Sequence, residues 1–131
     1  MKIKGLDGQV YNLKFDTDLP GVCSGLHEFA REALHEVFPC DTIAEEVILP
    51  GSNNMRFDFF LPLRRLAVEV QGEQHYTQNS KFHKNTGEFI AGKNRDKAKK
   101  QFCKINNITL LELKYNEQSE WRNQIIGWAS E

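Results

Sequence analysis

The stretch RFDFFLPLRRLAVEVQGEQHY, residues 56–76, decides the fold because it contains two apolar runs separated by a short connection. Runs 55–61 and 66–71 are rich in Phe, Val and Leu, which is typical of two antiparallel strands. Strict alternation sends successive side chains to opposite faces of a sheet. It predicts one set of Met55, Phe57, Phe59 and Leu61, and an opposite set of Arg56, Asp58 and Phe60.

The segments around this hairpin predict a compact α/β domain. We expect an N-terminal ribbon over 1–17 turning at Asp7-Gly8, a helix opening at Ser24, a strand over 42–49, a loop or short helix over 76–92, a helix over 93–106, a strand over 108–113 and a helix opening at Ser119. The strand 108–113 follows a helical crossover, so we expect it to run parallel to one hairpin strand.

Each predicted helix carries an apolar stripe at helical spacing, which indicates the face that packs on the sheet. The stripes are Leu26, Phe29, Ala30, Ala33, Leu34 and Val37 in the first helix, Ala98, Phe102 and Ile105 in the second, and Trp121, Ile125 and Trp128 in the last. His27 and Glu28 fall off the first stripe.

Two carboxylates stand inside the two best strands. Asp58 lies in the first apolar run and Glu69 in the second, and a tight hairpin can bring both to one face, with Gln71 beside Glu69. Burying an unpartnered carboxylate is costly, and a second one nearby adds repulsion. A divalent cation relieves both costs, and oxygen ligands suit Mg²⁺. A bound ion of this kind polarises phosphoryl oxygens and acidifies water, so the acids favour phosphodiester hydrolysis.

Simpler explanations exist for each of these residues. A lone acid in a strand is usually an exposed edge residue or an ion-pair partner, here of Arg56, Arg64 or Arg65. A lone histidine such as His75 after a strand is most often a surface residue. The combination of two acids, Gln71 and a following histidine is what favours a site.

These residues resemble a known group of enzymes. Hydrophobic-Asp-hydrophobic on one strand, a short turn and then Glu-x-Gln on the next is similar to the PD-(D/E)XK nuclease superfamily. Together with NRDKAKKQFC (94–103) and ITLLELKY (108–115), the stretch resembles the small phage and bacterial nucleases related to the very-short-patch-repair endonuclease, including stand-alone homing endonucleases. The resemblance covers roughly residues 24–115 and implies a restriction-endonuclease-like three-layer core, a mixed sheet with helices on both faces.

The resemblance also implies roles for individual residues. Asp58 matches the metal-binding aspartate of the hairpin, and Glu69 matches the second acid. Gln71 stands where many members have lysine. His75 matches a histidine that serves as general base or phosphate contact in the repair-type branch, and Asp96 matches that branch's downstream aspartate.

The first helix of the family usually adds a glutamate near its start. His27 or Glu28 occupies that place here, and the sequence does not choose between them. Glu46, on the preceding strand, is a further candidate metal ligand alongside Asp58 and Glu69.

Three features depart from the family pattern. Phe57 precedes Asp58 where the pattern has proline, and Gln71 cannot supply the positive charge of a lysine. The lack of that charge makes His75 more important, because some group must take the proton from water. Asp96 lies off the apolar stripe of its own helix, and a solvated surface acid is the alternative.

Charge patterning gives a candidate DNA-binding surface. The formal net charge is −1, so nucleic-acid binding must come from a local patch. Lys93, Lys97, Lys100 and Lys104 repeat at helical spacing, while Arg56, Arg64 and Arg65 add charge around the hairpin. A cationic stripe can track a phosphate backbone, although a solvated helix face explains lysines equally well.

The chain of 131 residues is long enough for one domain. We therefore expect a single nuclease-like domain over 1–131, with a ribbon over 1–17, a core over 24–115 and a C-terminal helix over 118–131. It has no membrane-span-length apolar run and no signal peptide, and its three cysteines are widely spaced, which favours a cytoplasmic protein with reduced thiols. The resemblance to the phage and bacterial nucleases implies that the cell is bacterial or phage-infected.

The prediction is a DNA endonuclease dependent on Mg²⁺ or Mn²⁺, of the phage, mobile-element or repair type. DNA is the expected partner, with a homodimer or a partner protein as a further source of specificity. The alternative is a non-catalytic nucleic-acid-binding domain on the same fold. A small-molecule hydrolase ranks last, because the sequence shows no pocket-forming insert.

Overall fold

The structure, a computed structural model, describes residues 1–14, 25–52, 55–72 and 86–130, with the backbone alone for 86–93. Its elements follow the predicted order of a ribbon, a helix, three strands, a helix, a strand and a helix. They are β1 (Lys2–Lys4), β2 (Val10–Asn12), α1 (Gly25–Val37), β3 (Ala44–Ile48), β4 (Arg56–Leu61), β5 (Leu66–Gln71), α2 (Thr86–Ile105), β6 (Thr109–Lys114) and α3 (Trp121–Ala129). Short 3₁₀ turns, η1 (Pro62–Arg64) and η3 (Tyr115–Glu120), precede β5 and α3.

The main sheet is mixed and has the strand order β3-β4-β5-β6. The β3/β4 and β4/β5 pairs are antiparallel. The β5/β6 pair is parallel along its whole length, from Leu66 opposite Thr109 to Gln71 opposite Lys114. The predicted parallel pairing across the helical crossover is therefore confirmed.

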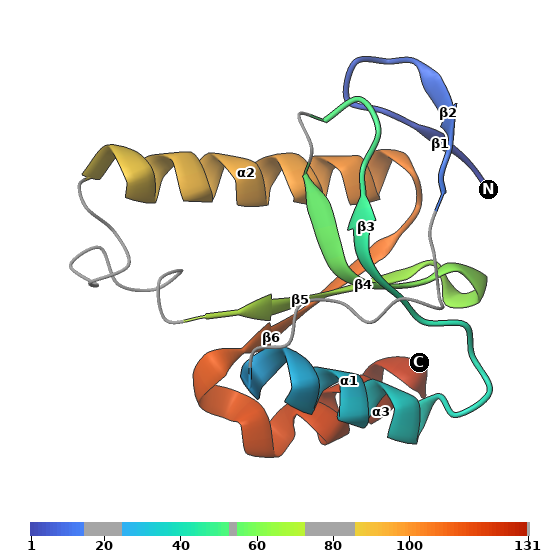
Figure 1. Cartoon of the computed structure of the whole chain (residues 1–131), viewed down its shortest axis with the longest axis vertical. Helices are drawn as coiled ribbons and strands as arrows, with labels where there is room; N and C mark the ends of the chain where they lie inside the picture. The colour runs from blue at the N-terminus through green and yellow to red at the C-terminus, as the bar shows by residue number, and fades with distance from the viewer. Residues whose placement is uncertain (15–24, 53–54, 73–85, 131) are drawn as a thin grey trace.

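Helices cover both faces of this sheet. In Figure 1, α2 lies across one face, while α1 and α3 pack side by side against the other. Phe102 of α2 belongs to one buried cluster with Phe57 and Phe60, and Leu34 of α1 belongs to a second cluster with Trp121. The prediction of a mixed sheet with helices on both faces is confirmed at this level.

The predicted alternation along β4 is wrong at Asp58. Phe57 packs in the cluster on the α2 side, together with Phe60, whereas Phe59 packs in the cluster on the α1 side. The pairing of β4 with β5 ends at Phe59 opposite Val68, so before that point β4 pairs only with β3. The strand is free to twist where it leaves its second neighbour, and the face of its side chains changes there.

The neighbouring strand β3 breaks its alternation at the matching place. Ala44 and Val47 both pack on the α2 side, although a regular strand would send them to opposite faces. Glu46 lies between them with a positive φ of 53°. A left-handed residue inside a strand rotates the chain, which explains why both flanking side chains reach the same cluster.

The helix α2 begins earlier than predicted, at Thr86, and ends as expected near Ile105. Phe102 is buried and Ala98 packs against the same cluster, as predicted, but Ile105 is 44% exposed, while Cys103 and the following Asn106 are buried. The side chain of Asn106 exchanges hydrogen bonds with the backbone of Lys4, which fastens the N-terminal ribbon to the end of α2.

The buried side of the first helix is the predicted one at Ala30, Ala33 and Leu34, but it differs at two positions. Phe29 is 44% exposed and meets Trp121 of α3 edge-on, whereas His27 is buried. Trp121 and Ile125 are buried as predicted for the last helix. None of the helices in the described part of the chain is both long and apolar enough to cross a membrane.

Candidate metal centre

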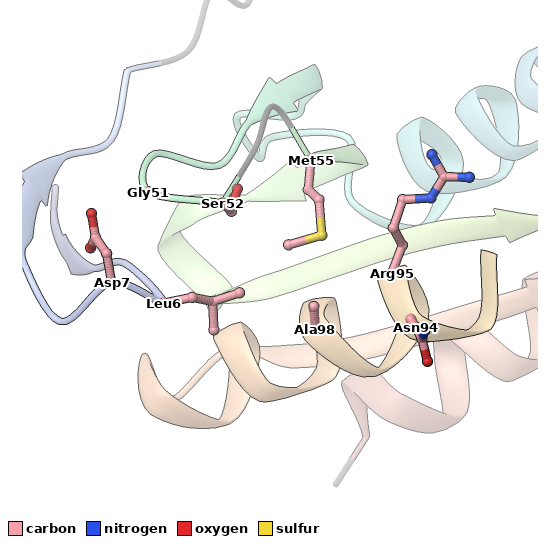
Figure 2. A pocket seen from close by; sticks show the side chains of 8 residues that line it. All are labelled: Leu6, Asp7, Gly51, Ser52, Met55, Asn94, Arg95 and Ala98. Carbon is pink, nitrogen blue, oxygen red and sulfur yellow. The ribbon is translucent and has the colours of Figure 1, made fainter. Parts of the chain in front are cut away.

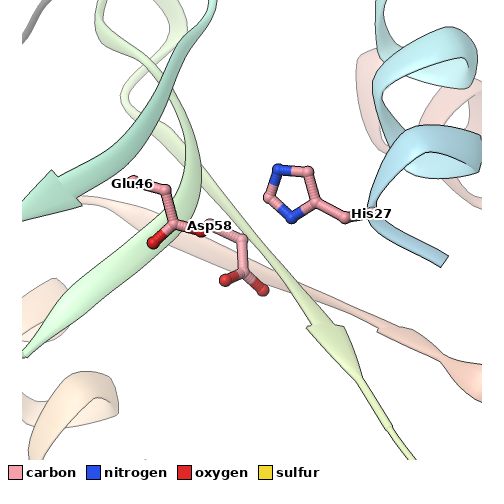
Figure 3. A group of neighbouring side chains, drawn as sticks. All are labelled: His27, Glu46 and Asp58. Carbon is pink, nitrogen blue, oxygen red and sulfur yellow. The ribbon is translucent and has the colours of Figure 1, made fainter. Parts of the chain in front are cut away.

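Three side chains from three elements meet where β4 leaves β5. His27 of α1, Glu46 of β3 and Asp58 of β4 each offer a ligand atom, and these atoms all lie within 4.8 Å of one another. Figure 3 shows the three side chains converging on a common point. The sequence left His27 and Glu28 as alternatives. In the structure His27 lies in this group, whereas Glu28 is exposed and lies outside it.

Glu46 reaches this point through an unusual backbone conformation. The flanking pairs, Glu45 with Phe59 and Val47 with Phe57, place it across from Asp58. Its φ of 53° is costly for a residue with a side chain, by about 1 kcal/mol. Strain of this kind gathers at functional sites, and here it aims a carboxylate. The Arg56 guanidinium lies 3.9 Å from the Glu46 carboxylate at the surface.

The orientation of His27 is set by Glu45 and Arg31. His27 Nε2 lies 3.0 Å from Glu45 Oε1, and Arg31 donates two hydrogen bonds to the same carboxylate, at 2.7 and 2.8 Å. The imidazole also stacks on Phe59, with ring centroids 4.5 Å apart. A carboxylate only accepts hydrogen bonds, so Nε2 carries a proton and Nδ1 is the ring nitrogen that can act as a metal ligand.

Asp58 and Glu69 are neighbours, as the predicted hairpin register requires. Glu69 Oε2 accepts a hydrogen bond from the backbone N–H of Asp58, and Asp58 Oδ2 accepts one from the N–H of Val70, both at 2.8 Å. The two carboxylates therefore accept hydrogen bonds from backbone N–H groups at the point where the pairing of β4 with β5 ends. This exchange fixes the position of both side chains.

Glu69 is buried and has a strongly shifted pKa. Burial, followed by the charge of Asp58, raises the pKa of Glu69 to about 7, while Lys99 opposes the shift. The Lys99 ammonium donates a hydrogen bond to Glu69 Oε1. The predicted metal ligands were Asp58, Glu69 and Glu46, and the structure groups Asp58 and Glu46 with His27, while Glu69 lies beside the group and binds Lys99.

Acidic residues form a row across the sheet. Glu46 lies across from Asp58, Asp58 lies beside Glu69, and Glu69 pairs with Glu112 of the parallel strand β6. Lys100 of α2 lies 3.4 Å from Glu112, so two successive lysines of one helix neutralise the far half of the row. Glu46 and Asp58, the two acids of the row that have no lysine contact among the described ion pairs, are the two that lie close to His27.

Lys99 is a site residue that the sequence reading missed. It lies outside the predicted stripe of exposed lysines, and it precedes Phe102 and Cys103 by one helical turn. The sequence offers no signal for it, because Lys99 lies off the predicted apolar stripe of its helix. Gln71, predicted to share the face of Glu69, is buried on β5.

The remaining predicted residues fall into two groups. His75 lies outside the described residues, as does the side chain of Lys93, so their predicted roles stay predictions. Asp96 is half-buried on α2 and is not part of the His27–Glu46–Asp58 group.

Two of the predicted DNA-binding arginines make structural contacts. Arg64 pairs with Asp41 at 2.7 Å and lies over the ring of Phe38. Arg65 donates hydrogen bonds to the backbone carbonyls of Asn106 and Asn107. These contacts of the two arginines are therefore with parts of the fold other than the strand acids Asp58 and Glu69, the ion-pair partners that the simpler explanation predicts. Among the lysines of α2, Lys97, Lys100 and Lys104 are exposed.

A separate cavity of about 610 Å³ lies between the N-terminal ribbon, the β3–β4 turn and α2. Figure 2 shows Met55 pointing toward α2, with Leu6 and Ala98 nearby and Asp7 at the ribbon end. The cavity includes none of the acids of the row.

The thiol of Cys103 lies close to the site and is buried. Burial raises the pKa of Cys103 to about 12, with a further contribution from Glu69. Among the described residues, Cys103 and Cys40 are both free thiols.

Comparison with known proteins finds partial similarity to viral proteins. The chain is 40% identical over 65 residues to uncharacterized protein 307L of Invertebrate iridescent virus 6, a match that covers 50% of this chain and 33% of that protein. It is 38% identical over 63 residues to uncharacterized protein 033L of Invertebrate iridescent virus 3, covering 48% and 32%. The match thus spans about a third of the length of these relatives. No family model and no solved structure matches.

Proposed function

We propose that this protein is a metal-dependent DNA endonuclease with a restriction-endonuclease-like core. The observation that carries the proposal is that ligand atoms of His27, Glu46 and Asp58 lie within 4.8 Å of one another, at the point where the pairing of β4 with β5 ends. The mixed sheet with helices on both faces, and the resemblance in sequence, support the same fold family. The viral relatives have names that state no activity, so a phage or repair role, like the cytoplasmic location, remains a prediction.

The donor set fits a divalent cation. Two carboxylates and one imidazole nitrogen would hold the ion. Without a cation, the two neighbouring carboxylates repel each other. When bound, such an ion stabilises charge on a phosphoryl oxygen and lowers the pKa of coordinated water. Glu69 holds Asp58 in place through the backbone N–H of that residue.

Lys99 supplies the positive charge that Gln71 cannot. Its ammonium bonds to Glu69, the residue that flanks Asp58, so it lies beside the proposed metal centre. A fixed cation at this place stabilises negative charge on a phosphate or an attacking hydroxide. His75 remains the proposed general base, and Lys97, Lys100 and Lys104 the proposed contacts to the DNA backbone.

A plasmid-nicking assay with Mg²⁺ or Mn²⁺ tests the proposal. The protein should convert supercoiled DNA to open circles, and Asp58→Asn should abolish this. Asp41→Asn is the matched control, because Asp41 pairs with Arg64 away from the metal centre. DNA binding without cleavage by the parent protein with either ion would favour the alternative of a nucleic-acid-binding domain.

A further inference from the structure

We propose that the site formed by His27, Glu46 and Asp58 selects a first-row transition-metal dication, from Mn²⁺ to Zn²⁺, over Mg²⁺. The inference rests on the proposed function in taking this cluster as the metal centre, and it goes further by naming the class of ion. It departs from the expectation of a purely acidic Mg²⁺ site.

The nature of the three ligands is the first argument. Mg²⁺ prefers oxygen ligands in octahedral geometry, whereas imidazole suits first-row ions such as Fe²⁺, Ni²⁺ and Zn²⁺, and Mn²⁺ begins the order of rising affinity for mixed nitrogen and oxygen sites. One of the three ligand side chains here is a histidine, and it is only 6% exposed. A buried imidazole cannot turn away and leave its place to water, so an ion at this point meets a nitrogen donor.

The surroundings of His27 are the second argument. Glu45 accepts from Nε2 and is held by two hydrogen bonds from Arg31, so the ring presents Nδ1 to Asp58 and Glu46. Figure 3 shows the ring edge that carries Nδ1 turned toward Asp58. A carboxylate behind a ligating imidazole fixes its tautomer and raises its basicity, as in histidine sites for zinc and related metals.

The third argument is that the ligands are held in place before any ion binds. His27 is stacked on Phe59, Asp58 is fixed by the N–H of Val70, and Glu46 is set by its left-handed backbone. Fixed ligands reduce the ordering cost of binding and limit rearrangement into an all-oxygen octahedron.

Metal binding to the full chain tests the proposal without any assay of activity. Mn²⁺ affinity is measured by electron paramagnetic resonance of free Mn²⁺, and Mg²⁺ affinity by competition. We expect Mn²⁺ to bind at least about tenfold more tightly than Mg²⁺. His27→Asp replaces nitrogen by oxygen and should lower this ratio about tenfold. His35→Asp adds the same charge at an exposed position of the same helix and should leave the ratio unchanged.

A measurement on the unaltered chain covers the case in which His27→Asp does not fold. Zn²⁺ should shift the ¹⁵N resonance of His27 Nδ1, while Mg²⁺ at the same concentration leaves it in place. Equal affinities for Mn²⁺ and Mg²⁺, or an unmoved His27 resonance with Zn²⁺, would overturn the proposal.

These results separate the inference from the proposed function. Selective Mn²⁺ binding through His27 with no DNA cleavage upholds the metal assignment and removes the nuclease. Cleavage by a protein that binds Mg²⁺ and Mn²⁺ equally upholds the nuclease and overturns the selectivity.

Discussion

The carboxylates of Asp58 and Glu69 each accept a hydrogen bond from a backbone N–H of the other residue's strand, and both hydrogen bonds are 2.8 Å long. These hydrogen bonds lie where the β4/β5 pairing ends, so the two side chains bind backbone N–H groups that no longer have a backbone partner on the neighbouring strand. The exchange leaves Asp58 facing His27 and Glu46 on one side and Glu69 facing Lys99 on the other. The proposed chemistry depends on this division of roles.

Glu69→Gln should change how stability depends on pH in metal-free protein. The folded pKa of Glu69, about 7, lies above the ordinary glutamate pKa of 4.5, so the folded state keeps a proton that the unfolded state releases. The contribution of Glu69 to stability is therefore full below pH 4.5 and is lost as pH rises to 7. The loss amounts to at most about 3 kcal/mol.

Urea unfolding at several pH values in EDTA measures this effect. Glu69→Gln and the parent should be equally stable near pH 4.5, and the variant should become the more stable of the two as pH rises. Glu32→Gln, an exposed change on α1, is the control and should follow the parent. A stability difference that does not vary with pH would show that Glu69 titrates normally.

Glu46→Gly and Glu46→Ala test whether the backbone of β3 is strained for function. Glycine adopts a φ of 53° without penalty, while alanine keeps the cost. The free energy of unfolding of the glycine variant should therefore be about 1 kcal/mol higher than that of the alanine variant. Both lose a metal ligand and should bind Mn²⁺ more weakly. Equal stabilities would contradict the left-handed conformation of Glu46.

Lys99→Met should slow DNA cleavage about 100-fold, because it removes the fixed charge beside the metal centre. Single-turnover cleavage rates at saturating protein separate this effect from DNA binding, which should stay unchanged. Lys2→Met, an exposed change in the N-terminal ribbon, is the control for loss of one positive charge. If both variants cleave alike, Lys99 is only the ion-pair partner of Glu69.

Replacing Lys97, Lys100 and Lys104 together by Gln should weaken DNA binding and reduce its salt dependence. Each lost phosphate contact lowers the slope of log affinity against log salt by about 0.9, so a change of roughly two to three is expected. The control replaces Lys2, Lys4 and Lys14 of the ribbon region, which removes the same charge elsewhere. Equal slopes for the two triple variants would indicate a solvated helix face.

The sequence predicted the sheet better than the site. The predicted strand 66–71 matches β5, Leu66–Gln71, because its apolar alternation is regular and both neighbours pair with it in register. The break at Glu46 and Asp58 was not predictable, because the left-handed conformation at Glu46 and the fork at Asp58 depend on tertiary contacts rather than local propensity.

The two site residues that sequence reasoning undervalued share one cause. A helical wheel ranks faces by apolar content, so a polar residue on the buried side is read as solvent-facing. His27 is buried against Phe59 and Glu45, and Lys99 is turned toward Glu69. Their importance comes from partners on other elements, which a single sequence does not show.

Anomalous scattering from a crystal grown with Mn²⁺ tests the central claim most directly. The account predicts a peak coordinated by His27 Nδ1 and by carboxylate oxygens of Glu46 and Asp58. A peak held by Asp58 and Glu69 without His27, or no peak among these residues, would contradict it.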